Sequence, residues 1–130
     1  MNPTQEFLSQ KRFAVVGAST DRAKYGNKVL RCYLQHGREV VPVNPKDATV
    51  EGLAAAKSLS EIQPPVDAVS VITPPKVTEA VVEEAGRLGI RHFWMQPGAE
   101  SDAAVARARE LGMNVIAGGP CVLVVLGFRE

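Results

Sequence analysis

Short apolar runs alternate with amphipathic stretches along almost the whole chain, and this alternation limits the possible folds more than any other feature. The apolar runs predict buried strands, at residues 13–16, 39–43, 67–72, 92–95 and 114–117. The amphipathic stretches predict helices, at residues 26–36, 76–88 and 100–111, with a short helix at 58–62. Residues 121–126 are apolar, and their pattern does not distinguish a strand from a helix.

Strands that alternate with helices of this length indicate right-handed βαβ units and a parallel sheet. We therefore expect an α/β fold: a single Rossmann-like, doubly wound parallel sheet of about five strands with helices on both faces. Residues 1–130 form one domain, because no repeat or linker divides the chain. Pro42 places the strand at 39–43 at an edge of the sheet, or at least near a strand end.

Composition excludes several classes of protein. The net charge of +1 gives no reason to expect nucleic acid or an anionic membrane as partner, and the aliphatic run at 122–126 is too short to span a bilayer. The first twelve residues lack the apolar core of a signal peptide. Two cysteines that lie far apart form neither a disulfide framework nor a zinc pattern, so we expect a cytoplasmic protein with reduced thiols and no metal.

The charge is unevenly distributed. Residues 1–50 contain eight basic and four acidic side chains, whereas residues 51–130 contain seven basic and ten acidic ones. A basic first third suits an anionic small molecule, although solvated helix faces account for the same excess.

Ligands of such sheets bind beyond the carboxyl ends of the strands, at the switch in strand order. This rule directs attention to four turns, at residues 17–25, 44–46, 73–76 and 96–98. In the first turn Gly17 permits a tight bend, and the small residues Ala18 and Ser19 allow backbone N–H groups to approach a phosphate at the start of a helix. Hydroxyls and positive charge are available from Thr20, Arg22 and Lys24.

The first turn is not a dinucleotide fingerprint, because Ser19 and Arg22 stand where the second and third glycines of GxGxxG would be. A close-packed turn without a ligand remains the alternative. The second turn, Asn44-Pro45-Lys46, lacks the acid that an NAD ribose requires. Lys46 suits a phosphorylated ribose instead, either the 2′-phosphate of NADP or the 3′-phosphate of coenzyme A. Its alternative is a solvated lysine in an ordinary turn.

The third and fourth turns are less specific. Thr73-Pro74-Pro75 forms a rigid apolar lip for an adenine or a pantetheine arm, or only a device that starts a helix. Gln96-Pro97-Gly98 offers an amide and free backbone groups. Neither histidine and neither cysteine has neighbours typical of a triad or a metal site, so we identify no catalytic residue; Cys32 and Cys121 are expected to be structural.

Several motifs together resemble the small stand-alone CoA-binding proteins of bacteria, whose fold is similar to the CoA-binding domain of the succinyl-CoA synthetase α subunit. The resemblance covers residues 10–125 and rests on Val15-Val16-Gly17-Ala18-Ser19, Tyr25-Gly26, Val41-Pro42-Val43-Asn44-Pro45, Val71-Ile72-Thr73-Pro74-Pro75, Trp94-Met95-Gln96-Pro97-Gly98 and Cys121.

The resemblance implies a set of ligand contacts. The first turn would face the pyrophosphate, the second the adenosine end and its 3′-phosphate, the third the adenine and diphosphate, and the fourth the pantetheine side. These contacts are Gly17, Ala18, Ser19, Thr20, Lys24, Tyr25, Asn44, Pro45, Lys46, Thr73, Pro74, Pro75 and Gln96.

Two features depart from the family. The ligase domain with its phosphorylated histidine is absent, and residues 122–126 are apolar where many relatives are charged. We expect a protein that binds coenzyme A or an acyl-CoA as a carrier, sensor or accessory subunit, without catalysis of its own. Its partners would be the CoA ligand and either a second copy of the chain or a ligase-type subunit. The alternative is an NAD(P)-binding oxidoreductase or redox sensor on the same fold.

Overall fold

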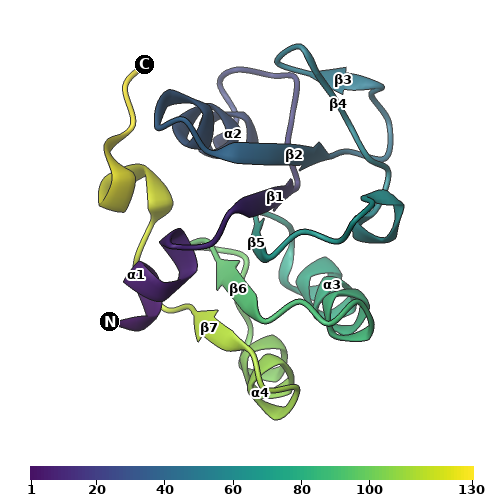
Figure 1. Cartoon of the computed structure of the whole chain (residues 1–130), viewed down its shortest axis with the longest axis vertical. Coiled ribbons are helices and arrows are strands. Elements are labelled where there is room, and N and C mark those ends of the chain that lie inside the picture. Colours follow the sequence, from purple (N-terminus) through teal and green to yellow (C-terminus); the bar gives the residue numbers. More distant parts are fainter.

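A five-stranded parallel sheet forms the centre of the computed structural model, which describes residues 1–130 (Figure 1). Its strand order is β2-β1-β5-β6-β7, and every neighbouring pair is parallel. The strands are β1 (Arg12–Val16), β2 (Glu39–Val43), β5 (Ala68–Val71), β6 (His92–Met95) and β7 (Asn114–Ile116). The chain runs from β1 outward to β2 and then returns to β5, so the order switches between β1 and β5. The predicted doubly wound sheet of five strands is confirmed.

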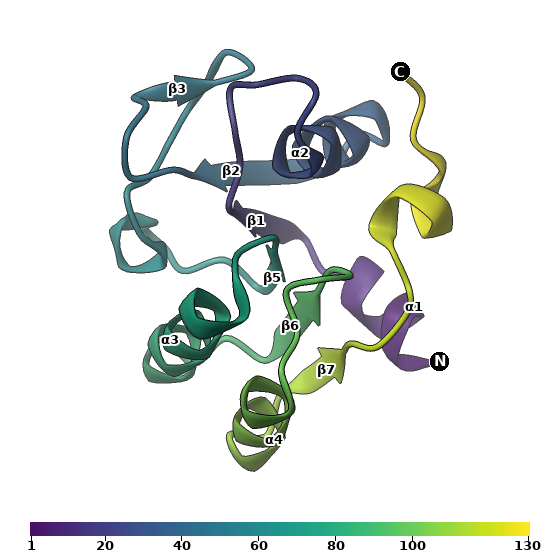
Figure 2. The same cartoon turned by 180° about the vertical axis from the view of Figure 1, so that it is seen from behind.

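Helices cover both faces of the sheet. On one face lie α1 (Pro3–Leu8), α2 (Tyr25–Gln35) and the C-terminal π-helical turn η2 (Leu123–Gly127); on the other lie α3 (Pro75–Arg87) and α4 (Asp102–Glu110) (Figures 1 and 2). Successive strand side chains point to opposite faces. Phe13 and Val15 of β1 therefore join the core under α2, and Ala14 and Val16 join the core under α3 and α4.

Strand β2 lies at the edge of the sheet, as Pro42 predicts. Its outer side is covered by the segment that leads toward β5. The Ala56 N–H donates to the Pro42 carbonyl at 3.0 Å, and the Asn44 N–H donates to the Ala56 carbonyl at 2.9 Å. This segment replaces the helix that usually connects parallel strands. It contains the hairpin β3 (Thr49–Val50) and β4 (Leu53–Ala54) and the 3₁₀ turn η1 (Leu59–Glu61).

Two elements were not predicted from the sequence, and a third segment that the sequence left open is assigned by the structure. Helix α1 was not predicted; it begins with a capping box between Asn2 and Gln5, and its Phe7 packs edge-on against Trp94 with ring centroids 5.3 Å apart. The hairpin β3–β4 was also missed. The apolar segment at 121–126, left open by the sequence, is helical from Leu123, and its Val122 is fully buried.

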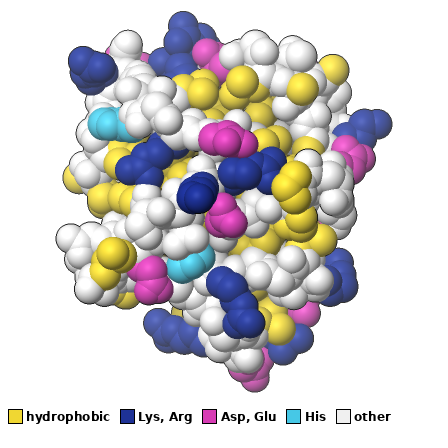
Figure 3. Space-filling view, in the orientation of Figure 1, with side chains coloured by type: hydrophobic (Ala, Val, Ile, Leu, Met, Phe, Trp, Pro, Cys, Tyr) yellow, Lys and Arg dark blue, Asp and Glu magenta, His cyan; other side chains and the backbone are white.

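No helix has both the length and the apolar character needed for a bilayer crossing. On the face seen in Figure 1, Lys and Arg side chains are interspersed with Asp and Glu side chains (Figure 3). That face therefore has no extended patch of one charge of the kind that a polyanion would require.

Candidate functional site

The four turns that follow β1, β2, β5 and β6 meet at the carboxyl edge of the sheet. Asn44 donates from Nδ2 to the Ala18 carbonyl at 3.1 Å and so joins the second turn to the first. The Tyr25 hydroxyl donates to Gln96 Oε1 at 3.2 Å and joins the first turn to the fourth. The third turn lies against the first, since a Cβ added at Gly17 would meet the Ile72 carbonyl oxygen. Residues up to 71 positions apart in the chain thus form one surface.

Backbone amides at the first turn have no acceptor within the protein. The N–H groups of Ala18, Ser19 and Thr20 make no hydrogen bond, and neither do those of Tyr25, Gly26 and Asn27 in the first turn of α2. The first four N–H groups of any helix lack an intrahelical partner, and together with a preceding glycine turn they form an anion-binding arrangement. The basic residues Arg22 and Lys24 are exposed beside them.

Two glycines make this turn possible. Gly17 has φ +95°, and a Cβ there would lie 2.1 Å from the Ile72 carbonyl oxygen. A Cβ on Gly26 would lie 2.0 Å from the carbonyl oxygen of Gly17, so α2 packs directly on the turn. Gly26 therefore provides the close helix–strand packing for which the third glycine of GxGxxG is known. Gly26 was not among the predicted ligand contacts, because it follows the strand at a longer spacing than that glycine does.

A buried polar network holds the first turn from behind. The side chain of Asn27 is fully buried and donates to the Ser19 carbonyl at 2.8 Å and to Glu51 Oε2 at 3.0 Å. Its Oδ1 accepts from Arg31 Nε at 2.6 Å, and Arg31 also donates to the Arg22 carbonyl at 2.9 Å. These side chains were missed because the hairpin carrying Glu51 was missed. The signal was present: Asn27 and Arg31 are polar residues four apart on the buried face of a helix.

The second turn is organised by Asn44 and not by its lysine. Asn44 Oδ1 accepts from the N–H groups of Lys46 at 2.7 Å and Asp47 at 2.9 Å, while Nδ2 is used by Ala18. Because both ends of the amide are occupied, Asn44 shapes the turn and leaves its neighbours to face a ligand. Pro45 and Lys46 are exposed.

A cavity of about 250 Å³ lies between the first three turns. Its apolar floor comes from β1, β2 and the start of α3, with Pro45 and Thr73 at its rim and Lys57 and Glu84 as its charged residues. The size is near the lower limit of small-molecule pockets. Lys46 does not line this cavity, whereas Lys57, which was not among the predicted ligand contacts, does.

A second cavity, of about 290 Å³, lies between the third and fourth turns. It is lined by Ile72, Thr73 and Pro74 of the third turn and by Pro97, Gly98 and Ala99 of the fourth. The Thr73 hydroxyl is hydrogen-bonded to the hydroxyl of Thr78 in α3 at 2.8 Å, which ties the lip to the helix that it starts. Pro75 is the first residue of that helix.

At the fourth turn, Gln96 is fully buried beside Tyr25 and Cys121. Its Oε1 accepts from the Tyr25 hydroxyl and from the Val122 N–H at 3.0 Å, whereas its Nε2 has no partner. The Tyr25 hydroxyl also lies 2.5 Å from Cys121 Sγ. Burial, followed by the hydrogen bond to this sulfur, raises the pKa of Tyr25 well above its ordinary value, so the phenol stays protonated. Cys121 is therefore part of this cluster, and Cys32 is buried in the core as expected.

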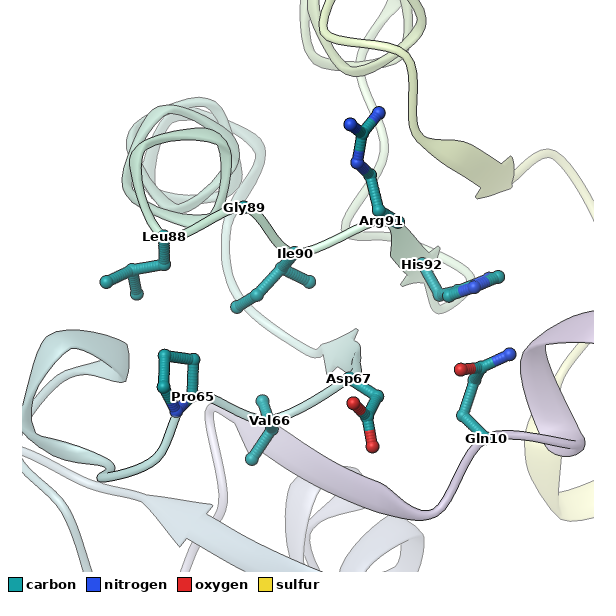
Figure 4. Close-up of a pocket in the computed structure, with 9 residues that line it drawn as sticks. All are labelled: Gln10, Pro65, Val66, Asp67, Leu88, Gly89, Ile90, Arg91 and His92. Atoms are coloured by element: carbon teal, nitrogen blue, oxygen red, sulfur yellow. The ribbon is translucent and has the colours of Figure 1, made fainter.

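Another cavity of about 290 Å³ lies at the opposite, amino edge of the sheet (Figure 4). Its polar groups are already engaged or turned away: Asp67 accepts from the Arg12 N–H at 3.0 Å, His92 lies 3.2 Å from the Asn114 amide, and the Arg91 guanidinium points outward. Strand ends of this kind rarely bind ligands in open α/β sheets. We therefore place the candidate site at the carboxyl edge.

A parallel, doubly wound sheet with unpartnered amides at its first turn has the architecture of a nucleotide-binding α/β domain. The family model for the CoA binding domain matches residues 11–127, and the chain belongs to this family. The family resemblance of the sequence motifs is thereby confirmed, and the match supports coenzyme A as the ligand. Neither the family nor the relatives support the NAD(P) alternative.

Three relatives illustrate the range of proteins with this domain. The uncharacterized protein YneT of Bacillus subtilis is 34% identical over 106 residues, which are 82% of this chain and 78% of YneT. The α subunit of the ADP-forming acetate–CoA ligase II of Pyrococcus furiosus is 34% identical over 86 residues, 65% of this chain but only 19% of that subunit. The structure of a conserved hypothetical protein from Pyrococcus furiosus superposes with a TM-score of 0.83 at 39% identity, covering 88% of this chain and 98% of that one.

Proposed function

We propose that the carboxyl edge of the sheet binds coenzyme A or an acyl-CoA, and that the protein acts as a carrier, sensor or accessory subunit without catalysis of its own. The observation that carries this proposal is the row of unpartnered N–H groups at residues 18–20 and 25–27. A diphosphate offers acceptor oxygens and negative charge to such a row. A buried or shielded amide without an acceptor costs free energy, which a bound anion recovers.

The two cavities beside this row match the two ends of the ligand. The adenosine end fits the cavity of about 250 Å³ between the first three turns, where Pro45 and Thr73 form the rim. Lys46 and Lys57 are the exposed basic residues on that side, and one or both would meet the 3′-phosphate. The pantetheine arm would leave the diphosphate toward the fourth turn and Gln96, past the prolines of the second cavity.

The end of β2 argues against an NAD-type ligand. No acid follows the strand until Asp47, and this carboxylate is held 3.3 Å from the Asn44 amide inside the turn. A ribose with two free hydroxyls therefore lacks its usual acceptor here.

An accessory role is supported by the ligase relative, in which the matching region is a fifth of a larger α subunit. A partner that carries the remaining ligase functions would give this chain a comparable task.

The direct test is native mass spectrometry of the protein purified without added ligand, followed by thermal denaturation with CoA, dephospho-CoA, NAD and NADP at equal concentrations. Ligand at 100 times its Kd stabilises the folded state by about 2.7 kcal/mol. We expect bound CoA in the mass spectrum and the largest rise in Tm with CoA. Equal shifts for all four nucleotides, or no shift with CoA, would refute the proposal.

A further inference from the structure

Cys121 is held in a fixed position by the buried groups around it. The carbonyl of Pro120 accepts from the indole of the fully buried Trp94 at 3.0 Å, and the N–H of Val122 donates to Gln96 at 3.0 Å. The carbonyl of Cys121 itself accepts from the N–H groups of Val124 and Val125, each at 3.0 Å. The backbone on both sides of the sulfur is thus fixed, while the side chain stays partly exposed.

Tyr25 gives this sulfur a hydrogen-bond donor that can follow its ionisation. When Cys121 is a thiol, its S–H can donate to the Tyr25 oxygen and the Tyr25 O–H donates to Gln96 Oε1, 3.2 Å away. When Cys121 is a thiolate, the same O–H turns to the sulfur, and Gln96 Oε1 keeps the N–H of Val122. Both protonation states are therefore satisfied, and a thiolate is the form that reacts with disulfides.

Gln96 points to a ligand next to this sulfur. Its Nε2 is buried without an acceptor. Oε1 of the same amide accepts from the Tyr25 hydroxyl, and this hydroxyl also contacts Cys121 Sγ, so Nε2 lies close to the sulfur. Buried N–H donors are nearly always paired in native proteins, so an acceptor from outside the chain is expected. The pantetheine arm ends in an amide whose nitrogen is joined to the terminal thiol by two carbons, and the carbonyl of this amide lies directly beyond that nitrogen. If that carbonyl accepts from Gln96, the ligand's sulfur lies near Cys121.

We propose that Cys121 captures CoA covalently by thiol–disulfide exchange with the symmetric disulfide of CoA, an inference that rests on the proposed CoA site. The Cys121 thiolate attacks one sulfur of the CoA disulfide; that sulfur–sulfur bond breaks as the Cys121–CoA bond forms. Cys121 gives its proton to solvent, the departing CoA thiolate takes one up, and no net oxidation occurs. A second thiol reverses the capture by the same exchange.

Cys32 supplies a matched control within the chain. It is fully buried on α2, its sulfur lies 3.8 Å from the Val122 carbonyl, and burial raises its pKa to about 11. Such a thiol is inert toward disulfides.

The test follows the intact mass of reduced protein after addition of CoA disulfide or pantethine, the corresponding disulfide without nucleotide. With CoA disulfide, the wild type and Cys32→Ser should each gain the mass of one CoA minus two hydrogens, and dithiothreitol should remove this adduct. Cys121→Ser should gain no mass. CoA disulfide should react about tenfold or more faster than pantethine at equal low concentration, because binding raises the effective concentration at the sulfur. An adduct on Cys32, or equal rates for the two disulfides, would overturn the inference.

Tyr25→Phe distinguishes a positioned donor from a merely structural side chain. The variant removes the hydroxyl that touches Cys121 Sγ, so we expect the exchange at neutral pH to slow about three- to tenfold, with CoA disulfide and with pantethine alike. A slower reaction with CoA disulfide alone, or unchanged rates with both disulfides in the folded variant, would contradict the role given to Tyr25.

Calorimetry with CoA under reducing conditions separates this inference from the proposed function. If Cys121→Ser binds CoA reversibly and the wild type forms no adduct, the capture is wrong and the CoA site stands. If neither protein binds CoA, the proposed function fails first.

Discussion

Gly26→Ala tests the packing that shapes the first turn. The new Cβ would lie 2.0 Å from the Gly17 carbonyl oxygen, whereas real Cβ atoms essentially never approach within 3.0 Å, so helix and turn must separate by about 1 Å. Gly17 cannot move away from the helix, because it already packs closely against the third turn: a Cβ added at Gly17 would lie 2.1 Å from the Ile72 carbonyl oxygen. Helix α2 is held in turn by fully buried Val29, Leu30 and Tyr33.

Overpacking of this kind costs about 1–3 kcal/mol, against a gain in helix propensity of at most about 1 kcal/mol. We expect Gly26→Ala to lose about 2 kcal/mol of the free energy of unfolding, or roughly 6–10 °C in Tm for a chain of this length. CoA affinity should fall about tenfold or more, since the amides at residues 18–20 move with the turn; tenfold corresponds to 1.4 kcal/mol.

Gly86→Ala is the matched control for denaturation and calorimetry. Gly86 also lies in a helix, but its Cβ would meet the end of the flexible Leu111 side chain at 2.8 Å, which can give way. We expect this variant to stay within about 1 kcal/mol of the wild type and to bind CoA unchanged. A Gly26→Ala protein that melts at or above the wild-type temperature and keeps its CoA affinity would refute the close-packing argument.

Four further variants probe the site and the sheet. Ser19→Asp places a carboxylate among the free amides of the first turn and should abolish CoA binding in calorimetry while the fold is retained, because the turn is at the surface; undiminished affinity would move the diphosphate elsewhere. Lys46→Ala and Lys57→Ala, compared with CoA and dephospho-CoA, should identify the lysine at the 3′-phosphate. Loss of the lysine that contacts the 3′-phosphate should lower the affinity for CoA roughly 5- to 150-fold, as expected for a charge-assisted contact of about 1–3 kcal/mol, and leave the affinity for dephospho-CoA unchanged. If each substitution changes the two affinities equally, neither lysine contacts the 3′-phosphate. His92 has its pKa lowered by burial, and its Nδ1 accepts from the Asn114 amide, which also donates to the Pro3 carbonyl at 3.0 Å. The unfolded state therefore binds the proton more readily, so stability is full above the ordinary histidine pKa and is lost as the pH falls through the lowered value. His92→Asn should flatten this loss in denaturation experiments between about pH 7 and 5, and an unchanged slope would show that His92 does not cause it.

The fold could be read from the sequence because each of its determinants is local. The alternation of apolar runs and amphipathic stretches specifies parallel strands buried on both faces. The turns that follow strands β1, β2, β5 and β6 must then meet at one edge. Pro42, which has no N–H to donate to a neighbouring strand, predicted an edge position or a strand end for residues 39–43, and β2 does lie at the edge. Family motifs added coenzyme A, and the family match agrees.

The site needed the tertiary structure, because its parts come from segments whose approach no local pattern encodes. Gly26 matters only because it packs on Gly17, and Asn27 only because a hairpin brings Glu51 to it. Lys57 enters a cavity wall because the segment after the hairpin covers the edge of β2.

Cys121 is the clearest case. From the sequence it is an isolated thiol, most simply a structural one. In the structure it is 2.5 Å from a hydroxyl 96 residues earlier in the chain, beside an amide with an unused donor. Apolar periodicity reports which face of an element is buried, and it therefore determined the sheet. Distances between side chains depend on how the loops close over that sheet, and only the tertiary structure determines those distances.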